Sequence, residues 1–280
     1  MVLGIKEGLV ECATVCVKSV VILLNIVELL LKNTNLEVDF DANSKYGYTG
    51  AGYTAFDLAC MQGHSCVVTT LMANAAVFRI DINERAFHLA CLSGHSDVFK
   101  TFIENASALN IDLNKKDRYS VTGFHRACQG GHSNVVKLFV ENATALRIDL
   151  NVTDNDGWTG FHRACQKSHF NVVKIFMENS LILGIDLNAQ DNDSYTAFHW
   201  ACLRDNTDVI KIFMEYALTL GIHLNNKDNH GYTGFHNACT FGHKDVVKVL
   251  MENAAKLSID LNVNDQEHLK RVEKIQLSRY

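Results

Sequence analysis

The sequence predicts an all-α solenoid of helix–turn–helix repeats, each ending in a short hairpin-like finger. Three observations lead to it: a phenylalanine that returns at a constant interval, apolar residues at helical spacing within each interval, and a turn-rich stretch between intervals. The recurring residues are Phe56, Phe87, Phe124, Phe161, Phe198 and Phe235, separated by 31, 37, 37, 37 and 37 positions. A fixed period of this size is the signature of a repeat architecture, so it decides the fold class before any single element is considered.

The unit around Phe161 shows the elements expected in each repeat. Thr159 stands where a helix begins, and its hydroxyl can accept a hydrogen bond from an unpaired backbone N–H of the first turn. Phe161, Ala164 and Cys165 follow at the spacing that places them on one buried face. A turn at Ser168-His169 ends this first helix, which we call helix 1.

A second helix, helix 2, is expected from about Asn171 onwards. Its inward residues are Val173, Phe176, Ser180 and Leu183, at positions i, i+3, i+7 and i+10. Beyond Gly184 the turn-forming residues 191–194 predict a hairpin-like segment, the finger, that leads into the next repeat.

These motifs resemble a known family. The unit that contains Phe235 reads Thr233-Gly234-Phe235-His236-Asn237-Ala238, then Gly242-His243 and Val246-Val247, with the stretch 228–231 ahead of it. This pattern resembles the ankyrin repeat, which is marked by T-P-L-H-x-A, a G-H turn, a V-V helix and a D-x-x-G finger. The resemblance covers roughly residues 25–266 and implies a module that binds proteins and does not catalyse a reaction, although a fold by itself does not establish function.

The resemblance also suggests how the chain is divided. We expect a degenerate N-terminal repeat or cap at 1–46, an array of six repeats at 47–266 and a degenerate C-terminal cap helix at 267–280. Terminal units with a polar outer face are what keep such arrays soluble. Between Phe56 and Phe87 six residues are missing, and we expect the finger to be the part that is lost.

Two further departures from the family concern the helices. The chain has no proline, and the first helical position holds glycine, as at Gly160 and Gly234, or alanine, as at Ala197; glycine there gives up pre-organisation and predicts modest stability. The period of 37 exceeds the usual 33, and we expect the four extra residues to add about one turn to the end of helix 2. A leucine recurs in this added turn and predicts packing between neighbours: Leu109, Leu146, Leu183, Leu220 and Leu257.

Histidine and cysteine recur as H-x-x-C, which raises the question of a metal site. The pairs are His88/Cys91, His125/Cys128, His162/Cys165, His199/Cys202 and His236/Cys239. Zinc takes about four ligands, and each repeat supplies two, on helices whose axes lie roughly 8–10 Å from the next. We therefore expect structural roles, with cysteine in a small buried position and histidine bonding the turn or a neighbouring cap, and we expect no cofactor.

Histidine also marks the turn between the two helices at positions 64, 95, 132, 169 and 243, where Asn206 is the exception. The tolerance of asparagine predicts hydrogen bonding and argues against acid–base catalysis. A row of lysines on helix 2 is followed at i+4 by glutamates: Lys100/Glu104, Lys137/Glu141, Lys174/Glu178, Lys211/Glu215 and Lys248/Glu252. Such pairs predict a solvated surface and argue against a phosphate-binding track.

Composition limits the other function classes. A net charge of −5 gives no reason to expect nucleic acid as a partner. Nine cysteines spread over 280 residues, with no visible secretory signal, predict reduced thiols in a cytoplasmic or nuclear protein. The apolar segment at 8–31 is interrupted by Glu11, Lys18, Asn25 and Glu28, which favours a buried repeat helix over a membrane span.

Function is expected at positions that vary while the repeat frame stays constant. In ankyrin-like stacks these positions, on helix 1 and on the finger, line one concave face. The candidate partner-binding residues are Arg126, Gln129, Trp158, Arg163, Gln166, Tyr195, Trp200, Arg204, Tyr232, Asn237, Phe241, Asn155, Asp156, Asn192 and Asp193. They are rich in the aromatic and arginine side chains that dominate binding hot spots. We expect partner contact for Arg126, Arg163 and Trp200, and packing between fingers for Tyr195 and Tyr232.

The sequence therefore predicts a monomeric adaptor or scaffold that binds a folded domain or a charged peptide. Three alternatives stay open. The protein could be a membrane-associated repeat protein anchored by its apolar N-terminal segment, or a metal protein or enzyme built on the His/Cys positions. It could also be a fragment of a larger multidomain protein.

Overall fold

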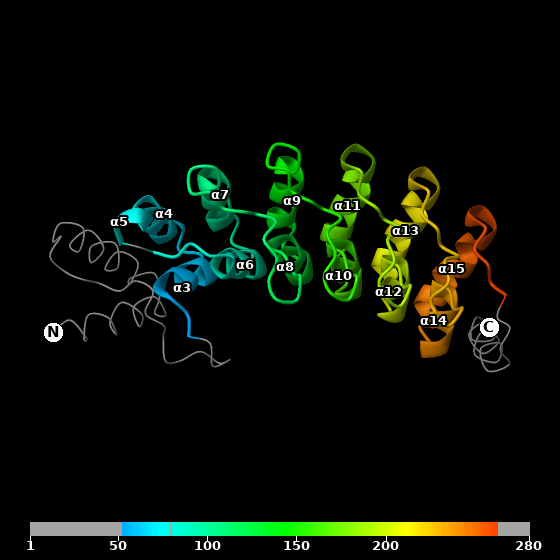
Figure 1. The fold of residues 1–280 in the computed structure, drawn as a ribbon. Coiled ribbons are helices and arrows are strands. Elements are labelled where there is room, and N and C mark those ends of the chain that lie inside the picture. The colour runs from blue at the N-terminus through cyan, green and yellow to red at the C-terminus, as the bar shows by residue number, and fades with distance from the viewer. Residues whose placement is uncertain (1–51, 79, 263–280) are drawn as a thin grey trace. The chain divides into compact units, whose positions relative to one another are not determined.

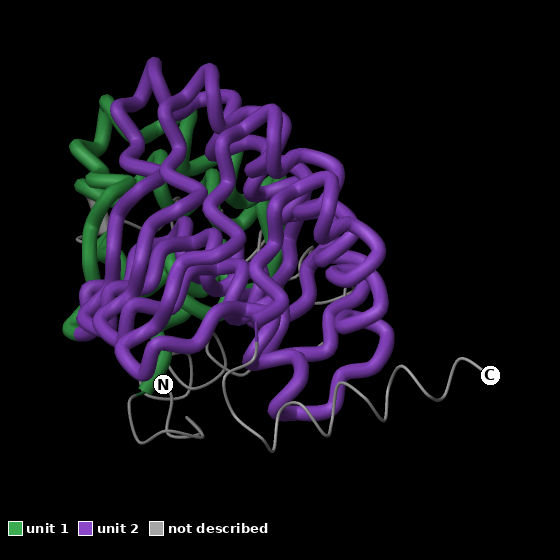
Figure 2. The backbone as a smooth tube through the Cα atoms, turned by 90° about the vertical axis from the view of Figure 1, so that its right-hand side faces the viewer, with its two compact units in different colours: residues 1–118 green, residues 119–280 purple. Residues whose placement is uncertain are grey.

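The computed structural model describes residues 52–78 and 80–262. The predicted N-terminal repeat at 1–46, with its apolar segment, and the predicted C-terminal cap helix at 267–280 lie outside the described residues. Contacts within the chain divide it into two compact units, residues 1–118 and 119–280, which are coloured separately in Figure 2.

In the first unit the described residues form a short helix 1 and a helix 2 in each of two consecutive repeats (Figure 1). The helices are α3 (Ala55–Gln62), α4 (Ser65–Ala73), α5 (Ala75–Phe78), α6 (Glu84–Ser93) and α7 (Ser96–Asn105). The expected loss of one finger is confirmed, because the chain passes from Ile80 to Asn83 and straight into α6, whose N-cap is Asn83.

The second unit repeats helix 1, helix 2 and finger with greater regularity. Its helices are α8 (Gly123–Gly130), α9 (Ser133–Asn142), α10 (Gly160–Gln166), α11 (Phe170–Leu183), α12 (Ala197–Leu203), α13 (Thr207–Leu220), α14 (Gly234–Phe241) and α15 (Lys244–Leu257). Among the described residues the only β-structure is an isolated bridge between Gln190 and Thr196. The predicted fold class, an all-α repeat solenoid, is confirmed.

The recurring phenylalanines form the core of each repeat and join it to the next. Phe124 contacts Phe139 of its own helix 2 at a ring-centroid distance of 5.2 Å, and Phe176 of the following repeat at 5.8 Å. Phe161 repeats the arrangement with Phe176 and Phe213, at 5.1 and 5.8 Å. Full burial of such a ring stabilises the fold by roughly 1.5–3 kcal/mol. The period seen in the sequence is therefore the period at which the core is packed.

Glycine at the first position of helix 1 has a reason that the sequence did not show. A Cβ atom on Gly160 would lie 2.9 Å from Cys128 Sγ, and one on Gly234 would lie 2.7 Å from Cε1 of Phe198. Both neighbours belong to the preceding repeat, so the glycine allows helix 1 to pack closely against the helix 1 before it. The lost pre-organisation is thus accompanied by a gain in contact between repeats.

Among the repeats that the structure describes, the added turn of helix 2 is helical in three. Helices α11, α13 and α15 are 14 residues long, whereas α7 and α9 end after 10 residues and continue as hydrogen-bonded turns. The leucines of this turn are half-buried, and Leu257 is buried. Packing of this turn between neighbouring repeats stays a prediction that the burial of its leucines supports, and the prediction of a helical turn holds for α11, α13 and α15.

Candidate functional site

Histidine on helix 1 completes a capping box with the threonine that precedes the helix. Thr159 N–H donates to Nδ1 of His162 at 3.2 Å, and the His162 backbone N–H donates to Thr159 Oγ1. The other ring nitrogen, Nε2, lies 3.1 Å from the carbonyl oxygen of Tyr195 in the next repeat. His199 makes the same contacts with Thr196 and with the carbonyl of Tyr232. These histidines therefore cap their own helix and bind the next repeat, as the sequence predicted.

This network requires a neutral ring. Nδ1 must accept the threonine N–H, and Nε2 must carry the proton that is donated to the carbonyl. Burial lowers the pKa of His162 and of His199, against the opposing effect of the backbone hydrogen bonds and of nearby aspartates. The histidines are thus built for neutral hydrogen bonding at pH 7, and not for exchange of protons with a substrate.

Histidine in the turn between the helices holds successive repeats together. Nε2 of His95 lies 3.0 Å from the carbonyl oxygen of Met61, and Nε2 of His169 lies 2.9 Å from that of Gln129. Each carbonyl belongs to the preceding repeat. Asn206, the exception, accepts a bond from Val209 N–H and caps α13, while its Nδ2 has no partner among the described residues. The predicted hydrogen-bonding role is confirmed.

The cysteines of helix 1 fill buried positions. Cys60, Cys128 and Cys165 have no measurable exposure, and burial raises the pKa of each thiol. A raised pKa removes the thiolate that nucleophilic attack and metal binding need. In the part of the chain that the structure describes, no three His, Cys, Asp or Glu side chains are grouped as a metal ion would require.

Aspartate at the start of each finger organises the loop. Oδ1 of Asp154 accepts the backbone N–H groups of Asp156 and Trp158, both at 2.9 Å, and Asp154 N–H closes the hairpin to the Trp158 carbonyl. Neighbouring fingers are joined by the bond from Asn192 N–H to the Asp156 carbonyl, at 3.1 Å. The acidic residue therefore fixes the finger, and the exposed side chains at its tip are carried on a rigid hairpin.

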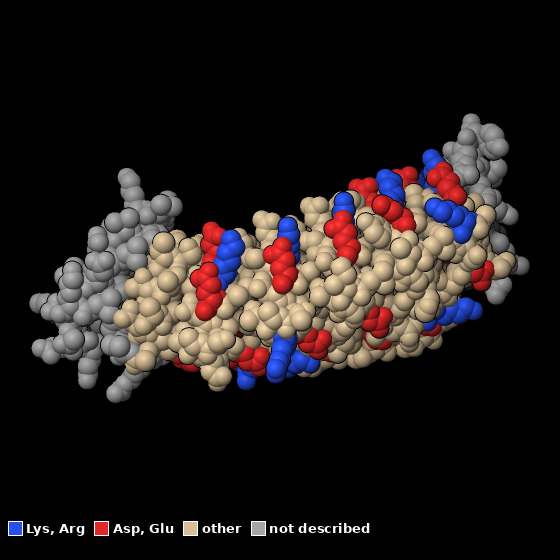
Figure 3. Space-filling view, turned by 90° about the horizontal axis from the view of Figure 1, so that it is seen from above, with Lys and Arg blue, Asp and Glu red and all other residues tan. Residues whose placement is uncertain are grey.

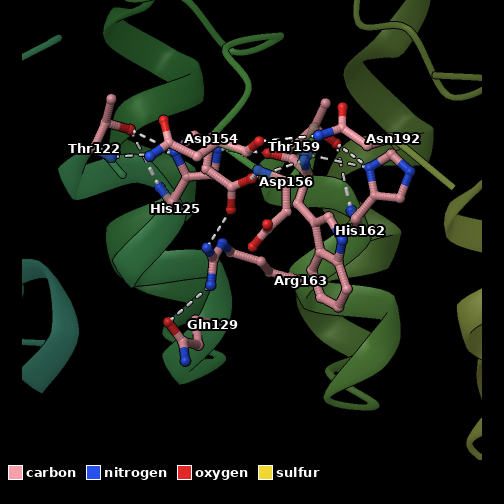
Figure 4. A network of polar contacts seen from close by, with 11 residues as sticks. Thr122, His125, Gln129, Asp154, Asp156, Thr159, His162, Arg163 and Asn192 are labelled. Carbon is pink, nitrogen blue, oxygen red and sulfur yellow. Dashed lines mark hydrogen bonds and ion pairs between the residues drawn. The ribbon is translucent and has the colours of Figure 1, made fainter. Parts of the chain in front are cut away.

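Arg163 and Trp200, predicted as partner contacts, are both tied to these aspartates. The Arg163 guanidinium pairs with Asp154 Oδ2 and donates to Gln129 Oε1 at 3.2 Å, so its side chain is 15% exposed (Figure 4). Trp200 Nε1 donates to Asp191 Oδ2 at 3.0 Å. Both side chains therefore bind the finger aspartate of their own repeat, Arg163 also contacts the preceding repeat, and only the remaining accessible surface of each is left for a partner.

The aromatic residues of two repeats form one cluster. The rings of Trp158 and Trp200 lie 4.5 Å apart, and the Tyr195 ring lies 5.3 Å from Trp200. Tyr195 also packs edge-on against His199, and Tyr232 packs against His236. The two tyrosines thus pack against their own helix 1, and Tyr195 also packs against the ring of Trp200. All three cluster residues are half-buried, so part of each ring faces solvent.

The remaining predicted residues differ in how much they expose. Arg126, Gln129 and Gln166 are half-buried, and Asn237 is buried. The exposed residues are Arg204, Tyr232, Phe241, Asn155, Asp156, Asn192 and Asp193. We call these candidates, together with the Trp158–Tyr195–Trp200 cluster, the helix-1/finger surface.

The opposite charges on helix 2 pair, though not always as predicted. Lys137 pairs with Glu141 and Lys174 with Glu178, each at 3.8 Å. Lys100 and Lys211 instead turn back to Asp97 and Asp208, three residues earlier. Blue and red side chains lie next to one another on successive repeats in Figure 3. These four lysines are therefore neutralised locally, and exposed pairs of this kind contribute little to stability.

None of the helices in the described ranges has the length and apolar character that crossing a membrane requires.

Comparison with known proteins adds one positive result. A family model described as ankyrin repeats (3 copies) matches residues 16–117, 87–191 and 179–265. Together these matches cover well over half of the chain. The search of curated proteins gives no significant match.

Proposed function

The chain belongs to the ankyrin repeat family, whose members generally mediate protein–protein interaction and are typically not enzymes, and from this premise we propose that it binds another protein through its helix-1/finger surface. The binding would be non-catalytic, and the protein would act as an adaptor or scaffold.

The aromatic cluster is the observation that carries this proposal. Trp158, Tyr195 and Trp200 are large side chains that remain partly exposed although each is held in place by packing. Tyrosine and tryptophan supply much contact area and lose little conformational entropy on binding, which is why they are enriched at interface hot spots. Phe241, 60% exposed at the end of α14, adds apolar surface on a neighbouring helix 1.

Exposed charged side chains lie on the same fingers and at the end of α12. Asp156 and Asp193 are exposed, and they sit on hairpins that are fixed by backbone hydrogen bonds. Arg204, also exposed, follows α12 directly. An apolar centre with a polar rim is the usual anatomy of a protein interface. A rigid surface of this kind also avoids the entropic cost of ordering loops on association.

Affinity capture with a matched control tests the proposal. We expect proteins captured by the wild type to be lost from a variant with three exposed charge reversals: Asp156→Lys, Asp193→Lys and Arg204→Glu. The control reverses three helix-2 charges with the same change in net charge: Glu141→Lys, Glu215→Lys and Lys248→Glu. Retention by the first variant and loss by the control would place the binding site on helix 2 and refute the proposal.

A further inference from the structure

Three finger aspartates in the described part of the second unit, Asp154, Asp191 and Asp228, are equivalent residues, and all three are buried. In each finger Oδ1 accepts two backbone N–H groups: for Asp191 from residues 193 and 195, at 3.0 and 2.8 Å, and for Asp228 from residues 230 and 232, at 2.8 and 2.9 Å. One oxygen of each carboxylate is therefore used by the loop. The other, Oδ2, is left to find a donor elsewhere.

In two of the three fingers helix 1 supplies that donor from the residue nine positions on. Asp154 Oδ2 pairs with the Arg163 guanidinium, and Asp191 Oδ2 accepts from the Trp200 indole N–H. At Asp228 the residue nine positions on is Asn237, whose side chain is shorter than both arginine and tryptophan. Within the described residues, Asp228 Oδ2 and Asn237 Nδ2 have no hydrogen-bond partner, and each of the two residues is only 5% exposed.

The Tyr195 hydroxyl does not remove this deficit. It approaches the Asp228 carboxylate, and burial, followed by the charge of Asp228, raises the pKa of Tyr195 to about 12. Among the described residues, however, no donor reaches Oδ2 with hydrogen-bond geometry. No lysine or arginine in residues 52–78 and 80–262 forms an ion pair with Asp228. A buried carboxylate oxygen without a donor is costly, and an outside cation that reaches it gains a charge-assisted bond.

We propose that Asp228 and Asn237 form a receptor for an arginine side chain of the protein partner, whose guanidinium binds Asp228 as Arg163 binds Asp154. This inference rests on the proposed function and names the chemistry that the surface recognises. The Asn237 amide N–H, which lacks an acceptor, would donate to a backbone carbonyl of the bound segment.

The repeat itself indicates arginine over lysine. The Arg163 guanidinium lies 6.0 Å from the centre of the Trp158 ring, which it covers. The residue equivalent to Trp158 beside Asp228 is Tyr232, which is exposed. A planar guanidinium can bind the carboxylate and stack on this ring at once, whereas an ammonium group cannot stack. Because both unpaired atoms are closed to solvent, binding requires side-chain rotation, which is the commonest change at interfaces.

Short peptides test recognition directly. The probes are the blocked tripeptides Gly-Arg-Gly, Gly-Lys-Gly and Gly-citrulline-Gly, and the readout is the NMR shift of the Asn237 side-chain amide and the Tyr232 backbone amide. We expect saturable shifts with the arginine peptide in the millimolar range, weaker shifts with lysine, and none with citrulline, which keeps the shape and loses the charge. Asp228→Asn should abolish them, and Asn237→Ala, followed through the Tyr232 backbone amide, should weaken binding without abolishing it, because it removes only the amide that donates to the bound segment. Equal shifts with lysine, or no shift with arginine, overturn the proposal.

An internal substitution tests the missing donor independently. Asn237→Arg should provide Asp228 with the contact that Arg163 gives Asp154, so the urea midpoint should rise while the arginine peptide no longer binds. A lower or unchanged midpoint would show that the carboxylate needs no donor, and the proposal fails. Failure here, with capture still sensitive to Asp156, Asp193 and Arg204, leaves the proposed function intact.

Discussion

At the scale of single residues, close contact between repeats depends on glycines, which have no side chain, as well as on the side chains that pack against them. Gly131 ends α8 with a φ of +72°, and a Cβ placed there would lie 2.6 Å from Cε1 and 2.7 Å from Cγ of His169. Gly242 ends α14 with a φ of +71° and has open space around it. The two glycines share one backbone conformation and differ in their neighbours. Comparing an alanine substitution at each position therefore distinguishes the cost of backbone strain from the cost of the steric contact.

We expect Gly131→Ala to lower the free energy of unfolding more than Gly242→Ala does. In both variants an alanine must adopt a left-handed backbone conformation, which costs roughly 1–2 kcal/mol. Only Gly131→Ala also pushes against the His169 ring, which is held by the Gln129 carbonyl, at a further cost of about 1–3 kcal/mol. Urea denaturation monitored by circular dichroism measures both. Equal losses would show that the His169 ring moves aside freely and does not hold the repeats.

At the scale of one element, the start of helix 1 carries a pH dependence. His162 and His199 begin from an ordinary pKa of 6.5 and are lowered by burial in the folded protein. The unfolded chain therefore binds protons at a higher pH than the folded chain. The contribution of these two histidines to the free energy of unfolding is therefore fully present above pH 6.5. It is lost as the pH falls through that value towards the lower pKa of the folded state.

We expect the free energy of unfolding to decrease between pH 7.5 and pH 5.5, with a shallower decrease in the double variant His162→Gln, His199→Gln. Urea titrations at a series of pH values measure the slope. Replacement of the exposed His230 by glutamine serves as the control and should leave the slope nearly unchanged. If the double variant keeps the full wild-type slope, these two histidines do not titrate with folding.

The elements also show where sequence reasoning succeeds and where it stops. The 37-residue interval, the capping threonine and the buried Phe, Ala and Cys of helix 1 were predictable because each follows from local pattern and periodic packing. The contact that requires Gly160 was not predictable, since it depends on how closely the preceding helix approaches. The roles of Arg163 and Trp200 were missed for a similar reason: their partners, Asp154 and Asp191, lie on fingers whose geometry no local pattern specifies. The sequence did contain one signal of these contacts, because in both repeats the helix-1 residue follows the finger aspartate by nine positions.

At the scale of the whole molecule, a buried cysteine recurs at the same position of successive repeats in the second unit. Its reactivity can report whether these repeats unfold together. Cys128, Cys165, Cys202 and Cys239 occupy one position in four successive repeats, and all are buried. Burial raises the pKa of every one of these thiols, to about 12 for Cys239. Cys66, in the first unit, is exposed. Because arrays of this kind are stabilised by contacts between nearest neighbours, opening of one repeat weakens the next.

We expect thiol labelling with iodoacetamide at pH 8, followed by peptide mass spectrometry, to modify Cys66 quickly and the four helix-1 cysteines only through opening of the fold. Unreacted thiols buried this way are not nucleophiles until they are exposed. With added urea the four should become reactive at a common midpoint if the second unit opens as one body, and Cys66→Ser should remove the fast labelling of the peptide that contains position 66 without changing that midpoint. Four separate midpoints would mean that the repeats open independently. Labelling of any of the four at the rate of Cys66 without urea would mean that the close packing of helix 1 does not persist in solution, and a rigid helix-1/finger surface would then lose its physical basis.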